Sequence, residues 1–245
     1  MDRVFRQDHR PISGVSHVAV AIREFSPGRR HTGIFYRVNA TDDIEFLHLA
    51  WHCDLQRDRA FSGEYYWVEP KINKARLRQL AAICDDIAAE NFPNRIPYAS
   101  GSPVGAFDEK TKAFLLGPTR AGLTCASFVL AVFERAELRL VRYSGWPAPD
   151  LVDVEFQQFV VDNLRGRHGV SKEHIEAVER EVGTSVRYRP EQVAGAAAIR
   201  MYRPVKYPYA KALGNDIVRF LRGEPELGEF QLTIWDRLLK RIGFA

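Results

Sequence analysis

The sequence predicts an α+β protein, in which a small antiparallel sheet packs on a helix that begins at Cys125 and a helical C-terminal extension follows. Three patterns support this prediction. The first third of the chain holds short apolar segments rich in β-branched residues. Apolar residues then recur at helical spacing in two later segments, and most of residues 147–245 follow a helical pattern as well.

The expected strands are separated by residues that favour turns. Segments 26–28 and 39–43 are rich in Ser, Pro, Gly, Asn and Asp. Between and around these turns we expect strands over residues 15–22, 32–38 and 44–52. Such short connections predict an antiparallel meander.

The helical segments are recognised by their apolar spacing and by their starts. Thr124 is suited to cap the helix that starts at Cys125, and Pro190 suits a first helical turn. We expect helices over residues 71–90, 125–136, 152–164, 172–182, 190–199 and 209–221. Segment 91–118 is rich in Pro and Gly and is predicted to be a long loop, a kind of segment that is often functional.

Length and composition are those of a globular protein. The chain has 245 residues, of which 46% are hydrophobic and 27% charged. This length fits one domain over residues 1–146 with a helical extension over 147–245 that packs on the same unit.

The charge pattern argues against nucleic acid as a partner. Lys and Arg number 35 against 31 Asp and Glu, a formal net charge of +4, and the basic residues are scattered.

Neither a signal peptide nor a membrane-spanning apolar run is recognisable, so we expect a cytoplasmic protein with no integral membrane segment, although export by another route stays open. Three cysteines without framework spacing favour a reducing compartment.

Cys125 is the strongest candidate for a reactive group. A thiol in the first turn of a helix lies at the positive end of the helix dipole, which predicts a lowered pKa. Its backbone N–H is free to face a developing oxyanion. The alternative is a small buried apolar residue. For Cys84, in the middle of an apolar helix face, packing is the favoured interpretation, and Cys53 beside His52 is a weak candidate.

A thiol nucleophile needs a base, and two histidines have suggestive spacing. If segment 39–43 closes a hairpin, Phe35 lies opposite Phe46 and Gly33 opposite His48. His31 and His48 are then diagonal neighbours on one face, so that one imidazole could act as the base and the other could orient it. Two ordinary strand histidines are the alternative.

Two further questions concern the histidines. His17, also at a strand start, is the competing base. The short ligand pairs of a zinc site are missing, and His48 and His52, on one strand, are too far apart to share a metal. We therefore predict no metal and no cofactor.

These segments, in this order, resemble the permuted branch of the NlpC/P60 papain-like superfamily, which includes the lecithin:retinol acyltransferase-like proteins and bacterial relatives. The resemblance covers residues 14–142. It rests on a first strand reading VAVAI, a second strand that opens with His31, a third that carries His48 in an H-L-A context, and a later helix that begins C-A-S-F-V at Cys125.

The resemblance implies a permuted papain-like fold with Cys125 as nucleophile, His31 as base and His48 as the third polar residue. The Ile96-Pro97-Tyr98 segment is similar to a P-Y element of NlpC/P60 proteins, which implies that Tyr98 lines the site or stabilises the oxyanion.

The function this implies is that of a cysteine hydrolase, a peptidase or amidase. Its substrates would be peptides, peptidoglycan-type isopeptides or protein conjugates. The alternatives are a lipid acyltransferase or phospholipase that uses the same Cys–His site, and a binding module that kept the fold and lost the activity.

Overall fold

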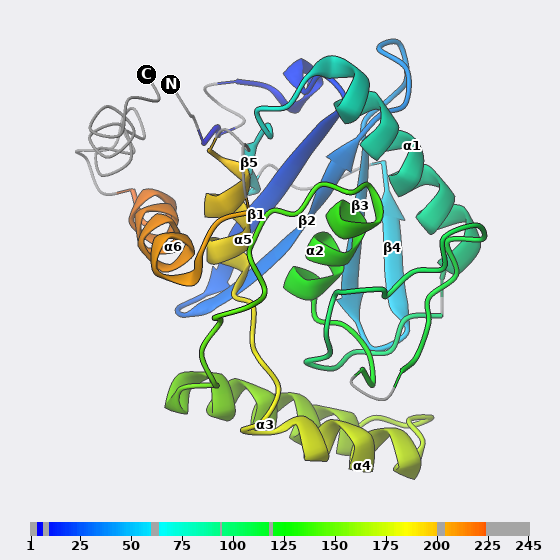
Figure 1. The fold of residues 1–245 in the computed structure, drawn as a ribbon, viewed down its shortest axis with the longest axis vertical. Coiled ribbons are helices and arrows are strands. Elements are labelled where there is room, and N and C mark those ends of the chain that lie inside the picture. The colour runs from blue at the N-terminus through cyan, green and yellow to red at the C-terminus, as the bar shows by residue number, and fades with distance from the viewer. Residues whose placement is uncertain are drawn as a thin grey trace.

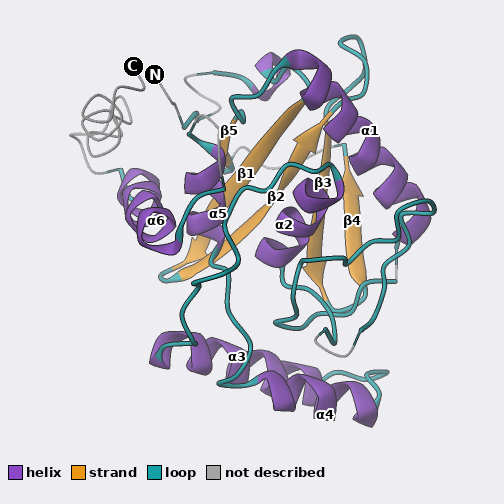
Figure 2. Ribbon diagram, in the orientation of Figure 1, coloured by secondary structure: helices purple, strands orange, loops and turns teal. Residues whose placement is uncertain are grey.

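The protein is an antiparallel sheet with helices on one face, followed by further helices. The computed structural model describes residues 4–6, 10–59, 64–93, 95–117, 120–199 and 204–223. The sheet has five strands in the order β4-β3-β2-β1-β5. They are β1 (Val18–Ser26), β2 (Arg29–Tyr36), β3 (Glu45–Trp51), β4 (Asp54–Asp58) and β5 (Tyr66–Val68). The predicted α+β class is confirmed at this level (Figure 2).

The three predicted strands form the centre of this sheet, and their register agrees with the sequence. Phe35 pairs with Phe46, as the turn over residues 39–43 requires. The edge strands β4 and β5 were not predicted. The sequence of β4, Asp-Leu-Gln-Arg-Asp, lacks an apolar pattern, and β5 has three residues. Both are paired with a central strand, so tertiary pairing and not local sequence places them.

The predicted helices are also present. They are α1 (Lys74–Asn91), α2 (Cys125–Arg135), α3 (Leu151–Arg165), α4 (Lys172–Glu181), α5 (Pro190–Ala197) and α6 (Tyr207–Leu221). Helix α1 starts three residues later than predicted because the Asn73 side chain accepts a hydrogen bond from the Arg76 amide and caps it there.

Alternation along the strands gives the sheet two different faces. Ile34, Tyr36 and Leu47 join a large core with residues of α1, α2 and α5, which cover this face (Figure 1). Their neighbours Phe35 and Phe46 point the other way, into a smaller core with residues of the N-terminal segment. Every central strand is therefore buried on both sides.

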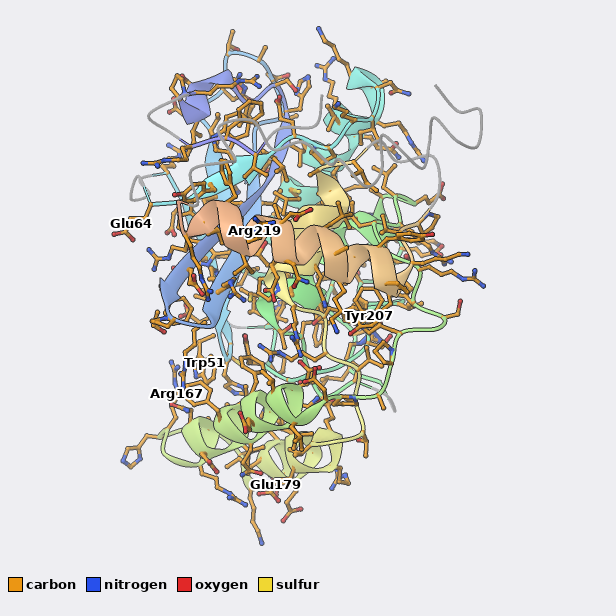
Figure 3. The ribbon with its side chains drawn as sticks, turned by 90° about the vertical axis from the view of Figure 1, so that its left-hand side faces the viewer. Trp51, Glu64, Arg167, Glu179, Tyr207 and Arg219 are labelled. Carbon is orange, nitrogen blue, oxygen red and sulfur yellow. The ribbon has the colours of Figure 1, made fainter. Side chains whose placement is uncertain are left out.

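The helices after α2 are attached to the sheet in different ways. Helix α5 packs on β1, β2 and α2, and α6 packs on α5. Helices α3 and α4 pack on each other and lie at one end of the molecule (Figure 1). At this end, the charge of Arg167, which follows α3, acts on His52, the residue after Trp51 (Arg167 and Trp51 are labelled in Figure 3). Within the described residues, no helix combines the length and apolar character that crossing a membrane requires.

Candidate active site

Cys125 is the first residue of α2, as predicted. The Thr124 hydroxyl accepts a hydrogen bond from the Ser127 amide at 3.1 Å, and the Ser127 hydroxyl accepts one from the Thr124 amide at 2.8 Å. This capping box fixes where the helix begins. It therefore also fixes the direction in which the Cys125 side chain leaves the first turn.

The Cys125 thiol lies between the sheet and the long loop. The Thr32 amide of β2 and the Tyr98 hydroxyl both hydrogen-bond it and favour the thiolate. Burial acts in the opposite direction and is the larger effect, so the pKa of the thiol is raised above its ordinary value. The lowered pKa expected from the helix position is thus wrong for this structure, because Cys125 is only 5% exposed and loses more hydration than these hydrogen bonds replace.

Tyr98 is buried next to the thiol. Its hydroxyl interacts with both the thiol and the backbone of Cys125, and burial raises its pKa. The loop that carries it runs alongside the segment before α2: the Leu123 amide donates to the Pro97 carbonyl at 2.9 Å. A Cβ on Gly122 would lie 2.2 Å from that carbonyl oxygen, so only glycine allows the approach.

On the neighbouring strands, two histidines and a carboxylate form a hydrogen-bonded chain. His31 Nε2 lies 2.9 Å from His48 Nδ1, and His48 Nε2 lies 3.1 Å from Asp58 Oδ2. The predicted proximity of His31 and His48 is therefore present. Asp58, on β4, was not predicted.

The Asp58 carboxylate determines the tautomer of both rings when they are neutral. A carboxylate only accepts, so His48 carries its proton on Nε2 and presents a lone pair at Nδ1. His31 then donates from Nε2, which leaves the lone pair of His31 on Nδ1. His31 is thus prepared to accept a proton at one defined atom.

The neutral state of His31 follows from its surroundings. Burial, the neighbouring His48 and Arg23 lower its pKa to about 3. Burial also lowers the pKa of His48, although Asp58 partly opposes this. Both rings are uncharged at neutral pH.

Gly33 allows the two histidine strands to come together. A Cβ on Gly33 would lie 2.5 Å from Phe46 Cε2 and 2.6 Å from His48 Cβ. The Phe46 ring fills the space beside Gly33 and stacks on His48 with centroids 4.3 Å apart.

The thiol contacts β2 at the residue that follows His31. The thiol contacts the amide of Thr32, and the preceding residue is His31. Helix α2 lies on one face of the sheet, whereas the His31 ring contacts Tyr65, which belongs to the core on the other face. A thiolate at Cys125 would raise the pKa of Tyr65, so Tyr65 lies near both the thiol and the His31 ring.

His17, the competing base, is placed elsewhere. Its Nδ1 lies 3.3 Å from the Arg37 carbonyl oxygen. Arg37 is five residues along the chain from Thr32, about 17 Å by strand rise. Of the two candidate bases, His31 is the one next to the segment that contacts the thiol.

The other two cysteines lie outside this neighbourhood. Cys84 is fully buried within the core on α1, which confirms its packing role, and burial raises its pKa. Cys53 is in the turn between β3 and β4, at a positive φ of 50°.

Sequence reasoning missed Asp58, the Thr32 amide and Tyr65. Asp58 lies opposite Phe46 on β4, which makes it a diagonal neighbour of His48. A prediction of β4 as a hairpin partner of β3 would have found it. The Thr32 amide carries no sequence signal, since every residue except proline has one.

The comparisons with known proteins found no match. No family model, no curated protein and no solved structure matches the chain.

Proposed function

We propose that this protein is a cysteine hydrolase of the permuted NlpC/P60 type, a peptidase or amidase that cleaves an amide or isopeptide bond. One observation carries the proposal. The thiol at the start of α2 contacts the residue that follows His31, and His31 is oriented by His48 and Asp58.

The protonation states suggest a general-base mechanism. The thiol has a raised pKa and His31 is neutral, so the nucleophile and the proposed base are both uncharged at rest. As Cys125 Sγ forms a bond to the substrate carbonyl carbon, its proton passes to His31 Nδ1, directly or through one water molecule. The charge that develops on His31 is stabilised through His48 by the Asp58 carboxylate.

The remaining steps use the same groups. The carbonyl oxygen becomes an oxyanion, for which the Cys125 amide and the Tyr98 hydroxyl are the nearby donors. When the carbon–nitrogen bond breaks, His31 returns the proton to the leaving amine. Water then attacks the thioester, giving one proton to His31, and this proton goes back to the sulfur as the acid leaves.

The test measures iodoacetamide alkylation of each cysteine by mass spectrometry at pH 7, together with hydrolysis of peptide amides and isopeptide conjugates. We expect Cys125 to react at least tenfold faster than Cys84. His31→Gln should remove this advantage, and Cys125→Ala should abolish hydrolysis. The matched control is His17→Gln, which should leave both readouts unchanged.

Other outcomes would support the other functions. If Cys125 reacts no faster than Cys84, the hydrolase proposal is wrong and an inactive binding module is favoured, since the thiol is buried. Hydrolysis of phosphatidylcholine vesicles without peptide cleavage would instead support a lipid acyltransferase or phospholipase.

A further inference from the structure

A second pair of histidines holds the backbone of Tyr98. His52 is in the turn after β3, and His174 is on α4 of the C-terminal extension. The Tyr98 amide donates to His52 Nδ1 at 3.3 Å, and His174 Nε2 lies 3.3 Å from the Tyr98 carbonyl oxygen. The two rings are 4.5 Å apart. The backbone N–H and the backbone carbonyl of Tyr98 are thus each bound by an imidazole, and the two imidazoles come from different parts of the fold.

This arrangement requires particular states of the rings. His52 must be neutral, with its lone pair on Nδ1, to accept from the amide, whereas His174 must carry a proton on Nε2 to donate to the carbonyl. Burial, His174 and Arg167 lower the pKa of His52 to about 4, and burial lowers the pKa of His174. Both rings are therefore neutral at the pH at which the thiol would react.

The contacts extend beyond the backbone of Tyr98. The Trp51 ring packs on the Tyr98 ring with centroids 4.5 Å apart. Further along α4, Glu181 accepts from the Ser100 amide at 2.7 Å and from the Ala121 amide at 3.1 Å. Helix α4 therefore binds the loop on both sides of the reacting centre: just after Tyr98, and four residues before Cys125.

We propose that His52 and His174 are positioning residues, which hold Tyr98 so that its hydroxyl reaches the Cys125 thiol and amide. By this inference α4 is part of the active site. The catalytic meaning of this role rests on the function proposed above. The geometric part, that the two histidines place the Tyr98 hydroxyl against the thiol, is tested without a substrate.

The test is a double-mutant cycle read by the pH midpoint of Cys125 alkylation. Tyr98→Phe removes a hydroxyl that favours the thiolate, so the midpoint should rise by about half a pH unit or more. His174→Leu should raise it comparably, and should add little in the Tyr98→Phe background. A midpoint reports thiolate stability, whereas a rate alone would also change with access.

Two variants separate positioning from general damage. His174→Gln keeps an N–H donor near the position of Nε2 and should restore the wild-type midpoint. His168→Leu makes the same kind of change at an exposed histidine and should leave the midpoint unchanged. Circular dichroism melting confirms that each variant is folded.

Amide hydrogen exchange of the segment around Tyr98 gives a second readout that needs no reactive thiol. His52→Leu and His174→Leu should accelerate exchange there, and His52→Asn, which keeps an acceptor near the position of Nδ1, should not. The inference is wrong if Tyr98→Phe leaves the midpoint unchanged, if the two shifts are additive, or if exchange is unaffected. If the wild-type protein hydrolyses no substrate but the double-mutant cycle gives the expected midpoints, only the proposed function is wrong.

Discussion

At the scale of single residues, the candidate site depends on contacts that tolerate little change in volume. Gly33 is the clearest example, because any side chain there would collide with Phe46 and His48. Next to Gly33, the Phe46 ring stacks on the face of the His48 ring. The two nitrogens of the same His48 ring bind His31 and Asp58. The orientation of the proposed base is thus coupled to packing in the small core.

We expect Gly33→Ala to destabilise the protein by about 1–3 kcal/mol, since an overpacked core must shift to make room. Urea unfolding followed by circular dichroism measures the change. The control is Gly166→Ala at the end of α3, where the added Cβ would meet nothing closer than 3.7 Å and φ is −76°. That variant should be neutral or more stable. Equal losses in both variants would show that the close approach at Gly33 does not exist.

At the scale of elements, the start of α2 is what aims the thiol. The capping box of Thr124 and Ser127 ends the preceding extended segment and begins the helix at Cys125. Helix α1 is capped in a related way by Asn73, but no candidate site residue lies in its first turn. Both caps stabilise a helix, but only the cap of α2 also places a candidate reactive group. Comparing variants of the two caps therefore distinguishes these two effects.

Replacing either cap by alanine should cost about 1 kcal/mol of folding free energy. Only Thr124→Ala should also change the pH midpoint of Cys125 alkylation, because only this cap adjoins the thiol. Thermal melting and alkylation, measured on Thr124→Ala and Asn73→Ala in parallel, check both statements. A midpoint shift in Asn73→Ala as large as in Thr124→Ala would contradict this account.

At the scale of the whole molecule, folding takes several histidines out of water. The pKa of His31 falls to about 3 and that of His52 to about 4, against 6.5 for an unperturbed histidine. Below pH 6.5 the unfolded chain binds protons that the folded protein does not. Stability contributed by these groups is therefore present above pH 6.5 and is lost as the pH falls. Glu181, whose pKa burial raises, acts in the opposite sense.

The free energy of unfolding should accordingly fall between pH 6.5 and pH 4, with each histidine contributing up to about 1.4 kcal/mol per pH unit. His52→Asn removes one of these groups and should make the dependence shallower. Urea unfolding at a series of pH values measures both slopes. An equally steep slope in His52→Asn would show that His52 is not protected from protonation by the fold.

What the sequence by itself determined was local. Turn residues and the apolar pattern sufficed for the three central strands, the Phe35–Phe46 register, the start of α2 and the proximity of His31 to His48, because each depends on near neighbours in the chain or on strand alternation. The edge strands and Asp58 required tertiary pairing.

Only the tertiary structure decided the chemistry of the thiol and the role of the extension. The raised pKa of Cys125 comes from burial, which a helix position cannot reveal. The backbone of Tyr98 is bound by His52, in a turn of the sheet, and by His174 on α4. Nothing in the sequences of these two segments predicts that they meet. Such contacts depend on how the completed elements pack, and packing is a property of the whole fold.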